Sequence, residues 1–217
     1  MTTQLPSPWR SAEERDQDRS QKREAVLQAA VRSFNENGFR ATSLEEIAAT
    51  LGVSKPTLYH YFAGKDDILF ECARRGLEDI REAAAAVERT GGSACQRLEA
   101  LMRGYAMVMT QDFGMCVIRV PDHELAPEVR RRLRDLKREI DLTVRRVVEE
   151  GVRDGSLVAG DPQLATFAIA GALNWIARWY DPFGARAPEE IAAGMASMLM
   201  SGMLPRPAGG GEERMSQ

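Results

Sequence analysis

The sequence predicts an all-α protein of about nine helices. Helix-favouring Ala, Leu, Glu, Arg and Met dominate, and aromatic residues make up only 6% of the 217 residues. Apolar residues recur three and four positions apart, which is the spacing of one helix face. Because 44% of the residues are hydrophobic, the chain is able to bury a core. We find no internal repeat and no convincing strand.

The first two helices are placed from their apolar spacing and end signals. A helix is expected over residues 20–37, where the stripe that ends in Phe34 faces inward and Gly38 supplies a stop. Ser43 and Glu46 have the spacing of a capping box, in which each side chain bonds the backbone of the other residue. A second, short helix should therefore begin there.

A tight turn then leads into a third short helix. Gly52 ends the second helix, Val53 is expected to plug the turn, and Ser54 is placed as the N-cap of the third. Pro56 lies in the first turn, where a missing N–H is harmless. A long fourth helix should follow over residues 66–88. The pattern is helix, tight turn, helix.

The rest of the chain predicts a helical body. We expect helices over residues 98–108, 127–151, 162–179 and 188–203, with residues 109–122 as an irregular apolar segment. The last two helices are apolar on most of their faces, which indicates a partner surface.

Charge and cysteine usage narrow the class of protein. The formal net charge is -3, so any nucleic-acid site must be local. Cys72, Cys95 and Cys116 are odd in number and widely spaced, as expected for buried thiols in a reducing compartment. There is no run of about 18 apolar residues and no secretory signal at the start, so we expect a cytoplasmic protein without a membrane span.

The segment from residue 52 to residue 65 carries no acidic side chain but many hydrogen-bond donors, which suits a phosphate-lined groove. We expect Lys55, Thr57 and Tyr59 to enter the major groove of DNA. The remaining candidates are expected to hold phosphates and set the register. Those phosphate-holding candidates are Thr42, Ser43, Ser54, His60, Tyr61 and Lys65. For Ser43 and Ser54 helix capping alone is an alternative, as are a solvated surface for His60 and packing for Tyr61.

Residues 20–70 resemble the helix-turn-helix signature of the TetR family of transcriptional regulators. The match is carried by ATSLEEIAATLGVSKPTLYHYFAGKDDIL at residues 41–69, with Phe34 and Gly38 upstream. The resemblance implies a DNA-binding domain at 20–66 and a ligand-binding and dimerisation domain at 67–204. Residues 1–19 and 205–217 are expected to be a disordered arm and tail, because they are polar and rich in Pro or Gly.

The body offers a candidate ligand pocket with an apolar, methionine-rich lining, although ordinary core packing explains each residue as well. The expected lining is Met102, Tyr105, Met109, Phe113, Met115, Ile118, Ile140, Phe167 and Trp175. Polar residues could hold a phosphate-bearing ligand at its mouth. They are Arg103, Arg119, Asn174 and Arg178. Residues 171–184, GALNWIARWYDPFG, resemble a TetR subgroup that answers to acyl-CoA thioesters of fatty-acid, aromatic or sterol breakdown.

The last two helices are the candidate dimer interface, since small residues allow close approach and large apolar ones supply area. In the TetR family they form a four-helix bundle between two subunits. The expected interface residues are Gly171, Ala172, Trp179, Met195, Met198, Leu199 and Met203. A share of this apolar surface could instead belong to the monomer's own core.

These observations predict a homodimeric repressor that a hydrophobic effector releases from a palindromic double-stranded operator, with an acyl-CoA as the effector class that the resemblance implies. The alternative is a TetR-type regulator of an efflux or stress gene that answers to a lipophilic drug-like molecule. Neither needs a cofactor or a metal.

Rival classes are less well supported. Residues 122–124, Asp-His-Glu, could suggest a metal site in a helical-bundle enzyme, but neighbouring ligands on one segment cannot converge and there is no Glu-x-x-His motif. The arginines of residues 129–146 could suggest a second DNA patch, but interspersed acidic residues favour a solvated helix face. A structural protein that has lost DNA binding is disfavoured by the intact donors Lys55, Thr57, Tyr59 and Lys65.

Overall fold

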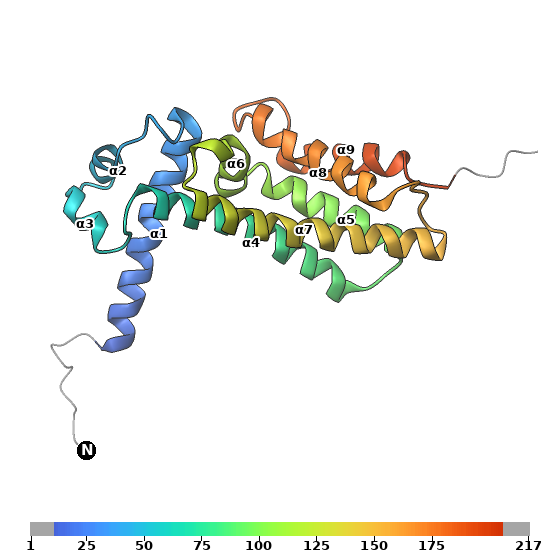
Figure 1. Cartoon of the computed structure of the whole chain (residues 1–217), viewed down its shortest axis with the longest axis horizontal. Coiled ribbons are helices and arrows are strands. Elements are labelled where there is room, and N and C mark those ends of the chain that lie inside the picture. Colours follow the sequence, from blue (N-terminus) through green and yellow to red (C-terminus); the bar gives the residue numbers. More distant parts are fainter. Residues whose placement is uncertain (1–10, 206–217) are drawn as a thin grey trace, which may run out of the picture.

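The computed structural model describes residues 11–205, apart from the side chains of Thr90 and Asp122. Within these residues it is all-α, as predicted, with nine α-helices and one turn of 3-10 helix (Figure 1). The helices are α1 (Ala12–Asn37), α2 (Leu44–Thr50), α3 (Lys55–Tyr59), α4 (Lys65–Thr90), α5 (Ala94–Val108), α6 (Asp112–Arg119), η1 (Asp122–Glu124), α7 (Pro127–Asp154), α8 (Pro162–Trp179) and α9 (Pro188–Ser201).

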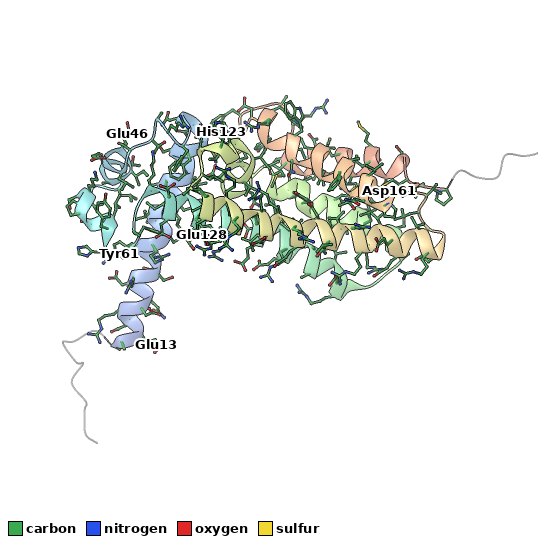
Figure 2. All side chains as sticks on the ribbon, in the orientation of Figure 1. Glu13, Glu46, Tyr61, His123, Glu128 and Asp161 are labelled. Carbon is green, nitrogen blue, oxygen red and sulfur yellow. The ribbon has the colours of Figure 1, made fainter. Side chains whose placement is uncertain are left out.

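The first helix begins eight residues earlier than expected. The Ser11 hydroxyl accepts from the Glu14 N–H at 3.0 Å and the Glu14 carboxylate accepts from the Ser11 N–H at 2.6 Å. This capping box fixes the start at Ala12, so the expectation of a disordered arm over residues 1–19 is wrong for residues 11–19. Glu13 lies at the end of α1 that projects away from the other helices (Figure 2). Residues 1–10 and 206–217, which carry the rest of the expected arm and tail, lie outside the described residues.

We call residues 11–64, with α1, α2 and α3, the head. Phe34, Ile47 and Leu58 are fully buried, one from each helix, and fix the angle between α2 and α3. Val53 does not plug the turn, because its side chain is 40% exposed. Its N–H instead donates to the Ala48 carbonyl at 3.0 Å, so the backbone of the turn is closed without the side chain.

We call residues 65–205, with α4 to α9, the body. The central helix α4 packs against α5, α6 and α7, and α9 lies along α5 (Figure 1). The segment expected to be irregular contains α6. A Cβ added at Gly76 of α4 would lie 2.4 Å from the Phe113 carbonyl oxygen, so α4 and α6 approach closely only because this residue is glycine.

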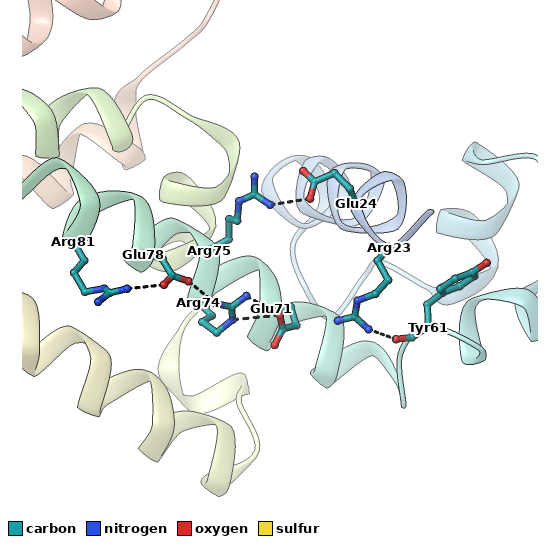
Figure 3. A network of polar contacts seen from close by, with 8 residues as sticks. All are labelled: Arg23, Glu24, Tyr61, Glu71, Arg74, Arg75, Glu78 and Arg81. Carbon is teal, nitrogen blue, oxygen red and sulfur yellow. Dashed lines mark hydrogen bonds and ion pairs between the residues drawn. The ribbon is translucent and has the colours of Figure 1, made fainter. Parts of the chain in front are cut away.

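Polar contacts tie the head to the body. Arg75 of α4 pairs with Glu24 of α1 at 2.8 Å (Figure 3), and Asn35 Nδ2 donates to the Asp112 carbonyl of α6 at 2.8 Å. Cys72 lies close to this junction, with its thiol 3.7 Å from the Leu27 carbonyl, and burial raises its pKa. The head is thus fixed both to α4 and to α6.

Ion pairs lie along the exposed side of α7. In α7, Arg131 pairs with Glu128 and Arg145 with Glu149, which supports the interpretation of a solvated face. Residues 122–124 form a single 3-10 turn, and the described residues hold no group of three or more side chains that could bind a metal. No described helix is long and apolar enough to cross a membrane.

Candidate nucleic-acid interface and ligand cavity

The helix α3 is short and presents one side to solvent. Only Leu58 of its five residues is buried, so the other side chains are available at the surface. Ser54 is the N-cap residue but makes no side-chain bond to the backbone of α3. Its hydroxyl instead lies 2.9 Å from the Thr57 hydroxyl. Ser54 therefore occupies the expected N-cap position without the side-chain cap, and the two hydroxyls form a polar pair at the start of the helix.

Lys55 lies on the same surface. Its ammonium pairs with the Glu45 carboxylate of α2 at 2.6 Å, which lowers the pKa of Glu45 and raises that of Lys55. Exposed ion pairs contribute little to stability, so the lysine can exchange this partner for another anion at low cost.

The aromatic end of α3 is divided between surface and core. Tyr59 is 51% exposed and His60 is exposed as well, so both can meet a partner. Tyr61 is half-buried and packs against the core, and its carbonyl accepts from Arg23 of α1 (Figure 3). This placement favours packing for Tyr61.

Two of the predicted phosphate contacts are internal instead. Thr42 is 1% exposed, and its hydroxyl donates to a backbone carbonyl, that of Gly38 at 2.9 Å or that of Ser33. The Lys65 ammonium donates to the Phe39 and Thr42 carbonyls, each at 2.9 Å. Thr42 and Lys65, which were predicted to hold phosphates, thus make hydrogen bonds that hold the loop before α2 in place, Thr42 from within the loop and Lys65 from α4. Ser43 forms the expected capping box with Glu46.

The body has a partly open cavity of about 280 Å³ between α4, α5, α6, α7 and α8. Five of the predicted ligand residues line it, namely Tyr105, Ile118, Ile140, Phe167 and Asn174, together with Leu77, Val117, Lys137, Asp141, Ala170 and Gly171. The cavity is mostly apolar with a few polar groups, as is usual for small-molecule sites.

The polar groups of the cavity come from three helices, α5, α7 and α8. The Tyr105 hydroxyl of α5 donates to the Asn174 Oδ1 of α8 at 2.9 Å, and burial raises the pKa of Tyr105 far above its usual range. On α7, burial raises the pKa of Asp141, and the nearby Lys137 partly offsets this. Lys137 and Asp141 were missed because polar residues on an amphipathic helix were assigned to the solvent face.

The other predicted ligand residues do not line this cavity. Met102 and Met109 are fully buried, so they fill the core rather than a site. Phe113 and Met115 are also buried, whereas Trp175 is 64% exposed at the surface of α8. Apolar residues that line an open cavity and apolar residues that fill a core look the same in the sequence, because only their contacts distinguish them.

The arginines assigned to the pocket mouth bind the protein itself. Arg103 pairs with Glu99 one turn earlier on α5. Arg119 donates to the Ala177 carbonyl at 2.7 Å and Arg178 to the Ile118 carbonyl at 2.6 Å, which ties α6 to α8. Arg74 and Arg81 line an adjoining hollow of about 250 Å³ that shares Leu77 and Ile140 with the cavity. Both pair with Glu78 (Figure 3).

The outer side of α8 and α9 is an exposed apolar face. We define this face by its exposed large side chains, which are Leu164, Phe167, Trp175, Trp179 and Met198. Gly171 is exposed between them, and Ala172, Met195 and Leu199 are half-buried. Met203 was assigned to the interface but is 9% exposed, and its carbonyl accepts from the Val158 N–H at 2.7 Å, so it belongs to the monomer's core.

Two family models match the chain. Residues 91–203 match "Tetracyclin repressor-like, C-terminal domain", and residues 26–72 match "Bacterial regulatory proteins, tetR family". The first match alone covers more than half of the chain and contains α5 to α9. The second contains the helix-turn-helix.

Individual relatives extend the similarity over most of the length. The chain is similar to the HTH-type transcriptional repressor KstR2 of Rhodococcus jostii (strain RHA1), with 29% identity over 85% of this chain and 92% of that protein. Among solved structures it resembles PfmR of Thermus thermophilus, with a TM-score of 0.75, 28% identity and coverage of 81% and 97%. It also resembles AibR in complex with isovaleryl coenzyme A and operator DNA, with a TM-score of 0.73, 26% identity and coverage of 82% and 98%.

Proposed function

Since this chain belongs to the TetR family of bacterial regulatory proteins and is a DNA-binding transcriptional regulator, we propose that it is a homodimeric repressor released from its operator by an effector with a hydrophobic group. The observation that carries this proposal is the exposed, acid-free side of α3, which the buried Leu58 holds at a fixed angle to α2. We propose that the protein acts in the cytoplasm and catalyses no reaction.

On this proposal α3 enters the major groove. Thr57 and Tyr59 contact base edges, and Lys55 leaves Glu45 to meet a guanine or a phosphate. Ser54 and His60 flank the helix and reach phosphates, and Tyr61 remains a supporting residue. These contacts account for a local DNA site on a chain whose net charge is -3.

A single α3 buries little surface, so the proposal requires two heads. The exposed apolar face of α8 and α9 would pair with the same face of a second copy around a two-fold axis. Two heads placed about 34 Å apart would meet successive turns of the same side of DNA, and the operator would be a palindrome.

For the effector we propose an acyl-CoA thioester whose acyl group enters the cavity. The apolar lining supports this, as does the similarity to AibR, which was solved with isovaleryl coenzyme A. The second candidate is a lipophilic cation, for which the Asp141 carboxylate at the cavity wall is the favouring observation. An efflux or stress regulator would use such a ligand.

The test is a footprint of the full chain on the promoter region of its own gene at low salt. We expect a protected palindrome whose protection is lost in Thr57→Ala and Tyr59→Ala, but not in the control Arg153→Ala on the body. Addition of octanoyl-CoA should release the protein, so that the nuclease again cuts the operator DNA. Release of the protein by lipophilic cations alone would favour the second candidate. Absence of protection on every fragment would overturn the repressor proposal.

A further inference from the structure

We propose that Asn174 recognises an uncharged carbonyl oxygen of the ligand, which in an acyl-CoA is the thioester carbonyl, and that Tyr105 sets the orientation of the Asn174 amide. This inference rests on the proposed effector class and assigns a chemical role to one wall of its cavity. Both side chains line the cavity, one from α5 and one from α8.

The hydrogen bond between these residues decides which end of the amide is available. The Tyr105 hydroxyl donates to Asn174 Oδ1 at 2.9 Å, so the oxygen end of the amide faces Tyr105 and one of its two acceptor positions is filled. Among the described residues, the amide nitrogen of Asn174 has no hydrogen-bond partner. An asparagine nitrogen carries two donors and no acceptor. The cavity wall therefore offers N–H groups that a ligand's acceptor can satisfy.

Tyr105 is well placed to hold this orientation. Its side chain is 5% exposed, and its burial makes loss of the hydroxyl proton unfavourable, so it remains a donor. If the Asn174 amide were flipped, its N–H groups would point at the Tyr105 hydroxyl. The Tyr105 hydroxyl proton would then need another acceptor. The observed orientation is thus the one that satisfies the tyrosine.

The other polar groups of the cavity favour a neutral acceptor over a carboxylate. Asp141 lines the same cavity from α7, and a second carboxylate nearby would be repelled by it. Lys137, one turn earlier, lowers the pKa of Asp141 and so favours its charged form, although burial raises that pKa. The amide of Asn174 is itself uncharged, which matches the uncharged oxygen of a thioester.

The volume of the cavity sets the size of the probe. The cavity has a volume of about 280 Å³, close to the lower limit of about 300 Å³ for small-molecule sites, so it suits a medium-length acyl group. An octanoyl group with its carbonyl oxygen is of this size. The coenzyme A portion must then remain outside the cavity.

The experiment compares octanoyl-CoA with S-octyl-CoA, a thioether that differs from it by the missing carbonyl oxygen, and with free octanoate. Binding to the full-length protein is measured by calorimetry. One satisfied hydrogen bond predicts roughly tenfold tighter binding of the thioester than of the thioether. In Asn174→Leu this ratio should fall to about one while the thioether binds as before. Tyr105→Phe, which frees the amide to rotate, should reduce the ratio in part.

The matched control is Ile118→Val, which alters the same cavity without touching a donor. It should weaken both CoA compounds equally and keep their ratio. A wild-type ratio near one, a ratio that survives in Asn174→Leu, or a ratio that Ile118→Val also abolishes would overturn the assignment of Asn174 alone. Octanoate that binds as tightly as octanoyl-CoA would overturn the preference for an uncharged carbonyl. If neither CoA compound binds, the proposed effector class fails together with this inference, while operator binding remains a separate result.

Discussion

The Lys65 ammonium at the start of α4 binds the backbone of the loop that precedes α2. We therefore predict that Lys65→Met destabilises the head without removing a phosphate contact. The ammonium makes two hydrogen bonds of 2.9 Å to the Phe39 and Thr42 carbonyls and lies 4.5 Å from the centroid of the Phe39 ring.

The size of the effect follows from these contacts. A hydrogen bond from a charged donor contributes about 1.5–3 kcal/mol and an exposed cation–π contact about 0.5–1 kcal/mol. Because Lys65 is only half-buried, water can replace part of this, and we expect a loss of about 3 kcal/mol in the free energy of unfolding. For a chain of this size the melting temperature should fall by about 6–12 °C.

Two measurements separate the two roles of Lys65. Thermal unfolding followed by circular dichroism gives the stability, and operator affinity between about 50 and 200 mM salt gives the number of phosphate contacts. The logarithm of the operator affinity falls linearly with the logarithm of the salt concentration, and each lost phosphate contact reduces this slope by about 0.9. A residue that contacts a phosphate in both subunits of a dimer therefore changes the slope by roughly two. We expect no change in slope for Lys65→Met and a reduction of roughly two for Lys55→Met. A reduced slope with an unchanged melting temperature in Lys65→Met would refute the structural role.

Three further predictions concern the body. Gly76→Ala should lower stability by about 1–3 kcal/mol or more, since its Cβ would lie 2.4 Å from the Phe113 oxygen. The control Gly160→Ala, with open space around it in the loop before α8, should leave the melting temperature unchanged. Burial raises the pKa of Asp141, so ionisation of this carboxyl opposes folding as the pH rises. Asp141→Asn should therefore raise the melting temperature at pH 7.5. This gain should vanish as the pH falls toward 3.8, the ordinary pKa of an aspartate. A constant gain would contradict that cause. Trp175→Glu on the exposed apolar face should convert the dimer to a monomer in light scattering, unlike Val152→Glu on α7; a dimer that persists would contradict the proposed interface.

Much of the fold could be predicted because its signals are local. Gly52, the capping box of Ser43 and Glu46, and the N-terminal prolines of α8 and α9 each mark a boundary by their own chemistry. The start of α1 could have been found in the same way, since Ser11 and Glu14 have the same spacing as the box before α2. Apolar periodicity alone could not show it, because the first turns of α1 are exposed.

The site was harder to predict because it depends on contacts between distant residues. Nothing near Lys65 in the sequence shows that its ammonium reaches Phe39, 26 positions earlier. Similarly, Met102 and Trp175 are as apolar as the residues that line the cavity. They do not line it because of the way their helices are rotated in the fold, which the sequence does not show. The α6 helix was missed since it is eight residues long and has no side-chain cap.

The central claim is that operator binding at α3 and ligand binding in the cavity exclude one another. It is tested most directly by titrating octanoyl-CoA into the protein alone and into the protein saturated with its operator. Because coupling is reciprocal, the operator should weaken octanoyl-CoA binding by the same factor by which octanoyl-CoA weakens operator binding. Equal affinity for octanoyl-CoA with and without the operator would contradict the claim.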